Sequence, residues 1–299
     1  MTQSQPYIAT LIAAPGQLVA EALGRARAAL PAPEKPNWLA PDTAADIPFT
    51  ASAGADQRVL TEALRSRLPG IDVVVQRTSH RRKRLFLADM DSTMIGQECI
   101  DELAAFAGLK DHVAAITERA MRGEIEFEPA LRERVALLKG LPVSVIDEVI
   151  EKHITLTPGA RTLVQTMRAN GVQTCLVSGG FTLFTDRIAK MIGFDEARAN
   201  SLVVDGDKLA GLVAEPIFGR ETKRATLLEL RARLHLLPEQ TMATGDGAND
   251  LAMIAEAGLG VAYHAKPKVA AAAQARIEHT DLTALLYAQG YRREEFVES

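Results

Sequence analysis

The chain has little of several features that would assign it to a protein class at once. Only two of its 299 residues are cysteines, Cys99 and Cys175, which argues against a disulfide-stapled secreted scaffold and favours a reducing, cytoplasmic compartment. No run of 18 or more apolar residues occurs, so we expect no helix that spans a membrane. The apolar N-terminal stretch has no basic segment before it, and we therefore expect no secretory signal.

A strong charge of one sign is also missing. The chain has 34 Lys and Arg residues against 38 Asp and Glu residues, a formal net charge of −4. This balance argues against a chain-wide electrostatic contact with nucleic acid or with an anionic membrane. Hydrophobic residues make up 47% of the chain, which is enough for a packed core, and the length suggests two domains or one large domain with an insertion.

The front of the chain, residues 1–78, reads as a small α/β unit of its own. Strand-like stretches near residues 7–13, 47–51 and 71–76 are separated by two helical patterns. Four prolines between residues 31 and 41 exclude a helix or a central strand there. The order strand, helix, strand, helix, strand loosely resembles a truncated ferredoxin-like module of the ACT kind.

The rest of the chain predicts an α/β fold with a doubly wound parallel sheet, because strand and helix patterns alternate repeatedly. The exception is a stretch near residues 97–153, which is helical almost throughout and follows the first strand of this part. We therefore expect a core formed by residues 79–95 and 156–299, with a helical cap at residues 96–155 inserted into it.

A basic run, His80-Arg81-Arg82-Lys83-Arg84, joins the two parts. No aromatic residue is interleaved with it, so we interpret it as a solvated joint rather than a binding surface. An alternative is that it draws an anionic substrate towards the site described next.

Three of the predicted strands end in polar motifs: Asp89–Thr93 (DMDST), Ser178–Gly180 (SGG) and Gly245–Asp250 (GDGAND). In an open α/β sheet, ligands bind beyond the carboxyl ends of the strands. Each motif alone is common turn chemistry, but their joint occurrence at strand ends of one domain predicts a shared site.

The acidic residues of these motifs indicate a cation. Asp89, Asp91, Asp246 and Asp250 would converge on one small volume, where carboxylates repel one another unless a counter-charge is present. An all-oxygen donor set suits Mg²⁺, and no cysteine or spaced pair of histidines accompanies it to favour zinc. Lys223 and the Ser178–Gly180 segment, which we place at a helix N-terminus, would add donors for an anion.

In this order, the DMDST, SGG, lysine and GDGAND elements resemble those of the haloacid-dehalogenase-like hydrolases. Residues 84–287 are similar to the phosphoserine phosphatase family within that group, through the opening motif near residues 89–101 and the cap stretches 118–123 and 131–135. The resemblance implies a Rossmann-like core with a helical cap. It also implies Mg²⁺-dependent hydrolysis of O-phospho-L-serine to L-serine and phosphate, the last step of serine biosynthesis.

The resemblance implies a role for each motif residue. Asp89 would be the nucleophile that forms an aspartyl-phosphate, and Asp91 the acid and then the base. Mg²⁺ would be held by the Asp89 carboxylate, the Asp91 backbone carbonyl and Asp246, with Asp250 in the outer shell. The residues that would position or neutralise the phosphate oxygens are Thr93, Ser178, Gly179, Lys223 and Asn249.

The cap would supply specificity. By the same resemblance, Glu98 would face the substrate ammonium and Arg134 its carboxylate, with Met121 and Phe127 closing over the serine moiety. Each has an ordinary structural alternative: an acid in the first turn of a helix for Glu98, a solvated face for Arg134, and apolar packing for the other two. Asp250 could instead cap the helix that follows it.

Other functions stay open at this stage. The chain could act on another small phosphate ester or transfer the phosphoryl group to an alcohol, and the front unit could be an amino-acid sensor or a module for homodimer formation. We assign no role to the histidines outside the basic run, and Lys266-Pro267-Lys268 is interpreted only as the start of a helix.

Overall fold

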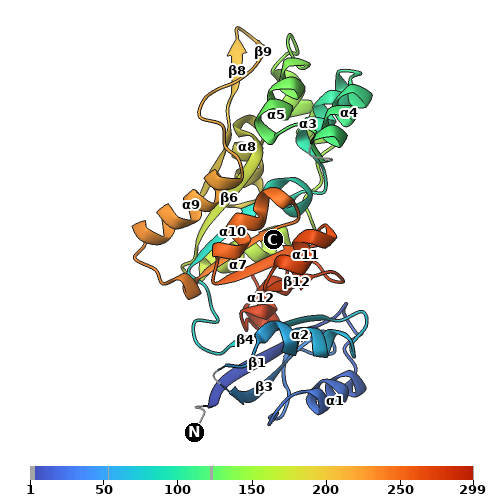
Figure 1. Ribbon diagram of the computed structural model, residues 1–299, viewed down its shortest axis with the longest axis vertical. Helices are drawn as coiled ribbons and strands as arrows, with labels where there is room; N and C mark the ends of the chain where they lie inside the picture. Colours follow the sequence, from blue (N-terminus) through green and yellow to red (C-terminus); the bar gives the residue numbers. More distant parts are fainter. Residues whose placement is uncertain (1–3, 53, 122–123, 299) are drawn as a thin grey trace.

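The computed structural model describes residues 4–52, 54–121 and 124–298, except for the side chains of Glu118, Ala120 and Met121. Figure 1 shows the parts stacked along the long axis of the molecule. The N-terminal sheet lies at the bottom, the larger sheet with β6 and its helices in the middle, and helices α4 and α5 with the β8–β9 hairpin at the top.

The N-terminal unit is a four-stranded antiparallel sheet in the order β2-β3-β1-β4. One strand was not predicted: β2 is a short edge strand that fits between the prolines of residues 31–41. With it, the element order becomes βαββαβ, which is that of a ferredoxin-like unit. The elements are β1 (Ser4–Ile12), α1 (Ala20–Ala29), β2 (Asn37–Ala40), β3 (Ala44–Ser52), α2 (Gln57–Arg65) and β4 (Asp72–Arg77).

The second sheet has six strands in the order β12-β11-β10-β5-β6-β7, and every neighbouring pair is parallel. The predicted doubly wound α/β fold is therefore confirmed. Its central strand β5 is buried throughout, which explains its continuous apolar sequence. The strands are β5 (Leu85–Asp89), β6 (Gln173–Phe181), β7 (Glu196–Asn200), β10 (Thr241–Gly245), β11 (Leu259–Tyr263) and β12 (Ala275–Ile277).

Along the chain, helices alternate with these strands, and in space they pack on the sheet. They are α7 (Ala160–Ala169), α8 (Thr182–Ile192), α9 (Arg220–Arg233), α10 (Leu251–Glu256), α11 (Pro267–Ala272) and α12 (Ala284–Ala288). Among the described residues, no helix is both long and apolar enough to cross a membrane.

The helical segment that follows β5 and precedes α7 contains α3 (Cys99–Phe106), α4 (Lys110–Met121), α5 (Phe127–Ala136) and α6 (Ser144–Lys152). A hairpin of β8 (Leu202–Asp205) and β9 (Lys208–Val213) turns at Gly206-Asp207, where the Asp205-Gly206 pair favours a tight turn. The hairpin reaches this helical segment, where the Gly140 amide donates to the Leu209 carbonyl at 2.8 Å.

The end of β6 differs from the prediction. The strand continues through the Ser-Gly-Gly motif to Phe181, and α8 begins only at Thr182. Ser178, Gly179 and Gly180 therefore belong to a strand end rather than to the first turn of a helix. The Gly180 amide already donates to the Ser178 hydroxyl at 2.8 Å, so it is not a free donor for an anion.

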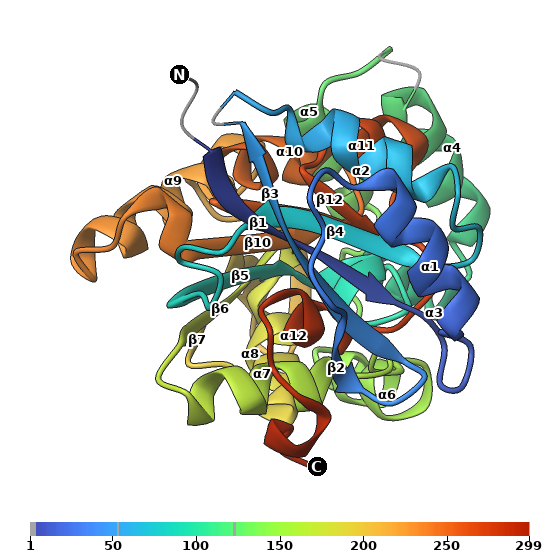
Figure 2. The ribbon, with the colours of Figure 1, turned by 90° about the horizontal axis from the view of Figure 1, so that it is seen from below.

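The basic run is not the solvated joint that the sequence suggests. Arg81 binds both oxygens of Asp46 at 2.6 Å and donates to the carbonyls of Tyr287 and Ala288, so that it joins the N-terminal sheet to the end of α12. Lys83 is 5% exposed. Figure 2 views the molecule from this end, with the N-terminal sheet in front of the core.

Candidate active site

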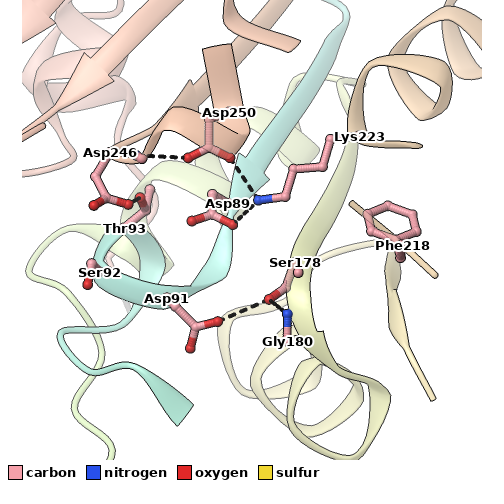
Figure 3. A network of polar contacts seen from close by, with 12 residues as sticks. Asp89, Asp91, Ser92, Thr93, Ser178, Gly180, Phe218, Lys223, Asp246 and Asp250 are labelled. Atoms are coloured by element: carbon pink, nitrogen blue, oxygen red, sulfur yellow. Dashed lines mark hydrogen bonds and ion pairs between the residues drawn. The ribbon is translucent and has the colours of Figure 1, made fainter. Parts of the chain in front are cut away.

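The strand-end motifs meet at one edge of the six-stranded sheet. Strand β5, which ends at Asp89, pairs with β10 on one side and with β6 on the other. Because neighbouring parallel strands end at the same edge, Asp89 comes to lie between the Gly245–Asp250 loop and Ser178 (Figure 3). The predicted convergence of these motifs thus follows from the strand order.

A buried lysine lies between two of the carboxylates. The Lys223 ammonium forms ion pairs with Asp89 and, at 2.7 Å, with Asp250, and its side chain has no exposed surface (Figure 3). The second oxygen of Asp250 accepts from the Gly247 amide at 3.1 Å. Asp250 precedes α10, but its side chain does not cap that helix; it holds the lysine and the Gly247 turn instead.

The electrostatics of this cluster are strongly perturbed. Burial raises the pKa of Asp89 well above its usual range; the nearby Asp250 charge adds to this, and Lys223 opposes it. Burial alone would lower the pKa of Lys223, but Asp250 and Asp89 more than offset burial and raise it. Burial and then Asp250 also raise the pKa of Asp246. Negative charge is therefore in excess around one ammonium group.

Asp91 is held in a fixed orientation beside Asp89. Its two carboxylate oxygens accept from the Cys99 amide at 2.9 Å and from the Ser178 hydroxyl at 3.1 Å. Burial raises the pKa of Asp91, and these hydrogen bonds partly counter the increase. The backbone turns sharply just after it, since Ser92 has a φ of 54°, in the left-handed region. The Asp91 side chain points towards Ser178 (Figure 3).

The helical segment contributes a pair of opposite charges. Glu98 accepts from the Ser92 hydroxyl at 2.7 Å, while partial desolvation and then Asp91 raise its pKa to about 7. Arg134 is half-buried and donates to the Ala130 carbonyl at 3.2 Å. Burial lowers the pKa of Arg134, and the carboxylates of Asp101 and Glu98 oppose that effect.

Phe127, at the start of α5, closes the same side of the site. It is 37% exposed, and its ring faces two glycines of the core. A Cβ atom on Gly219 would lie 3.3 Å from the ring, and one on Gly179 would lie 3.5 Å from it. Because glycine has no side chain, these two positions leave room for the aromatic ring.

These groups surround a cavity of about 140 Å³. Eight of the predicted residues line it, while Thr93, Ser178 and Lys223 do not and instead lie against the lining carboxylates. The side chain of Met121, also predicted here, lies outside the described residues. The predicted residues that line the cavity are Asp89, Asp91, Glu98, Phe127, Arg134, Gly179, Asp246 and Asn249.

The sequence interpretation missed one charged lining residue. Lys266 begins a helix as expected, because Pro267 is the first residue of α11, but it also lines the cavity. Its amide donates to the Asp246 carbonyl at 3.2 Å. The polar loop after β11 was the available signal, since it follows a strand of the same sheet as the three motifs.

The carboxylates could hold a metal ion. One oxygen from each of Asp89, Asp246 and Asp250 lies within 4.8 Å of the other two. The donor set is all oxygen and carries more negative charge than Lys223 balances, which fits a hard divalent cation.

Comparisons with known proteins agree with this geometry. Residues 83–258 match the family model of the haloacid dehalogenase-like hydrolases. A phosphoserine phosphatase from Polaromonas sp. is 50% identical over 208 residues, which cover 68% of this chain and 88% of the relative. One from Streptomyces coelicolor is 45% identical over 259 residues, 84% of this chain but 63% of the relative's length.

A solved structure resembles nearly the whole chain. The crystal structure of a probable phosphoserine phosphatase from Vibrio cholerae superposes with a TM-score of 0.76 at 32% identity and covers 97% of this chain and 88% of that one. The similarity therefore includes the N-terminal unit as well as the core.

Proposed function

Because the chain belongs to the haloacid dehalogenase-like hydrolases, we propose that it hydrolyses O-phospho-L-serine to L-serine and phosphate. The observation that carries this substrate is the pair Glu98 and Arg134, which line the same small cavity as Asp89. A zwitterionic head group needs one charge of each sign, and an arginine matches a carboxylate with two parallel hydrogen bonds.

In the proposed reaction, a carboxylate oxygen of Asp89 attacks phosphorus and the bond to the serine oxygen breaks, which leaves an aspartyl-phosphate. Asp91 gives its proton to the departing serine oxygen. Its raised pKa supports this acid role. Asp91 then takes a proton from the water that attacks phosphorus, and the Asp89 carboxylate and phosphate are released. Each proton that Asp91 donates is thus recovered in the second step.

Mg²⁺ is the cation we propose for the acidic cluster, held by the carboxylates of Asp89 and Asp246 and the backbone carbonyl of Asp91, with Asp250 further out. When bound, it would draw negative charge away from the phosphoryl oxygens. Lys223 keeps the Asp89 and Asp250 carboxylates in place. Asn249 and Gly179 line the cavity and would contact phosphate oxygens, with Ser178 and Thr93 orienting Asp91 and Asp246.

The proposal also covers the location of the protein, the N-terminal unit and an alternative activity. Two buried, unpaired thiols, Cys99 and Cys175, support a cytoplasmic location. The βαββαβ unit could serve as an amino-acid sensor or as a surface for homodimer formation. Hydrolysis of another small phosphate ester, or transfer to an alcohol, is the alternative activity.

A substrate panel tests the proposal. With Mg²⁺ present, kcat/KM for phosphoserine should exceed that for phosphothreonine and for sugar phosphates, and a chelator should abolish turnover. Comparable kcat/KM values across the panel would contradict the assigned substrate, while turnover that a chelator leaves unchanged would contradict the metal. A product assay for free phosphate against phosphorylated alcohol separates hydrolysis from transfer.

A further inference from the structure

A second cavity, far larger than the first, lies where the N-terminal unit meets the core. Its volume is about 840 Å³, within the range of small-molecule sites. Segments far apart in the chain contribute to its lining, among them residues 12–15 of the N-terminal unit, residues 155–159 where the chain returns from the helical segment, and several residues between 279 and 296 near the C-terminus. Sites between structural units are a common place for ligands.

Two buried tyrosines in its wall have unused hydroxyl groups. Tyr263 is 5% and Tyr287 4% exposed, and both line the cavity. Neither hydroxyl forms a hydrogen bond with a described residue, and neither hydroxyl oxygen is fully buried. Buried tyrosines usually find a partner for the hydroxyl. Burial raises the pKa of both, so each remains a hydrogen-bond donor.

The described lining carries charges of both signs, so the Arg293 guanidinium, and not a net charge, is the group that an anion would meet. Asp281 is the one acid among the described lining residues, and its carboxylate already accepts from the Thr283 amide at 2.8 Å. Arg293 and His279 line the same wall. Arg293 pairs with Glu298 at 3.3 Å, a solvent-exposed contact that an entering anion would replace at little cost.

The rest of the wall is apolar. Ile12, Leu156 and Phe296 line it, and the Phe296 ring packs 4.9 Å from that of Tyr287. A ligand that satisfies the phenol hydroxyls and Arg293 would therefore place an apolar body against these side chains.

The cavity also borders the two segments, near residues 95–96 and 155–156, through which the chain passes between the core and the helical segment. We call these two segments the chain crossings. Ile95 and Leu156 form an antiparallel bridge there, and the Gly96 amide donates to the Thr155 carbonyl at 3.0 Å. Ser92 lines the large cavity while its hydroxyl donates to Glu98 of the small one. Ser92 of the large cavity thus contacts Glu98 of the small one, and Ser92 has a left-handed conformation, a constrained backbone of the kind found at functional sites.

We propose that this cavity is a second ligand site, which takes a small organic anion with an apolar body and, when filled, changes turnover by acting on the paired crossings. The ligand would accept hydrogen bonds from Tyr263 and Tyr287 and balance Arg293. His264 and His279, to which the sequence assigned no role, lie in its wall.

The binding test uses three matched probes on the full chain: phenylacetate, its neutral isostere phenylacetamide, and phenylphosphonate. Titration calorimetry should show saturable binding of at least one of the two anions, with the amide weaker by about 10-fold. Whichever of the two anions binds with higher affinity then indicates whether the ligand carries a carboxylate or a phosphoryl group. Equal binding of phenylacetamide and both anions, or no binding of either anion, would overturn the proposal.

The variants are chosen to leave the fold intact. Removing both hydroxyls, in Tyr263→Phe/Tyr287→Phe, breaks no hydrogen bond among the described residues and should weaken anion binding by about 5-fold or more. Tyr7→Phe, a buried tyrosine that does not line the cavity, should bind as the wild type does. Unchanged affinity in the double variant would refute the site, whatever the substrate of the enzyme proves to be.

A kinetic measurement tests the link to the active site. Phosphoserine turnover should change saturably with the probe anion, at the concentration that half-fills the site, and raising the substrate should not reverse the effect. Inhibition that substrate fully reverses would place the probe in the small cavity and contradict the proposal.

Discussion

Two buried ion-pair clusters in this molecule differ in how their charges balance. Beside the small cavity, the buried ammonium of Lys223 pairs with Asp89 and Asp250, while the carboxylates of Asp91 and Asp246 lie nearby in the cavity lining. Between the N-terminal unit and α12, the Arg81 guanidinium meets one carboxylate, Asp46. The surplus negative charge of the first cluster suits a bound cation, whereas the charges of the second cluster balance each other.

The interface cluster satisfies its polar atoms within the protein. Thr10 accepts from Arg81 at 2.8 Å and donates to Asp46 at 2.9 Å, and the remaining guanidinium donors reach the carbonyls of Tyr287 and Ala288. Such a network has no spare site for a ligand, and we interpret it as structural. The comparison predicts that changes in the two clusters will affect activity and stability in opposite ways.

The largest effect is expected for Asp89→Asn. Loss of the nucleophile should lower kcat on the order of 10³-fold or more, measured by phosphate release. Stability should not fall, because the change removes a buried charge that Asp250 repels, and the thermal midpoint should equal or exceed that of the wild type. Near-wild-type turnover would show that Asp89 is not the nucleophile.

Arg81→Met should lower the stability of the protein and leave its activity nearly unchanged. It leaves Asp46 buried without its partner, which costs about 3–5 kcal/mol of the free energy of unfolding, while kcat/KM of the folded enzyme stays close to wild type. Denaturant unfolding measures the cost. The double variant Arg81→Met/Asp46→Asn is the control and should recover much of the loss; if it is as unstable as the single variant, the ion pair is not the cause.

The neighbouring Lys83 gives the interface a pH dependence. Burial lowers its pKa to about 8, while its ammonium donates to the Glu239 carbonyl at 2.8 Å. Between pH 8 and the usual lysine value, the unfolded chain binds the proton more tightly than the folded one, so stability rises with pH. Relative to Lys83→Met, the wild type should gain roughly 2–3 kcal/mol across that window. If the free energy of unfolding changed equally with pH in both proteins, this prediction would be contradicted.

The smallest effect concerns substrate choice. Arg134→Ala should raise KM for phosphoserine by about 10- to 50-fold and leave that for phosphoethanolamine, which has no carboxylate, nearly unchanged. The neighbouring Arg132→Ala is the matched control, because Arg132 pairs with the exposed Glu215 and does not line the cavity. Equal losses on both substrates would remove Arg134 from carboxylate recognition.

Local sequence patterns were sufficient for most of the core and for the convergence of its motifs. The apolar run before Asp89 predicts a doubly buried strand, and the repeated strand–helix alternation predicts a parallel sheet. Parallel strands place their carboxyl ends on the same side of the sheet, and the adjacency of β5 and β10 then brings the DMDST and GDGAND motifs together. The family resemblance added Glu98, Phe127 and Arg134, which no local pattern singles out.

Local patterns were insufficient wherever distant segments decide the environment of a side chain. Arg81 and Lys83 look like a solvated run until α12 and the Glu239 loop are packed against them. Strand β2 has too few residues for a clear pattern and exists because β3 offers it an edge.

The sequence by itself therefore determined the sheet, its order of motifs and the excess of negative charge at one edge, because these depend on residue type and short spacing. Only the tertiary structure decided which charges are buried and balanced, that Lys266 lines the small cavity, and that a large second cavity lies beside Ser92. Those outcomes depend on contacts between residues far apart in the chain, which short-range patterns do not encode.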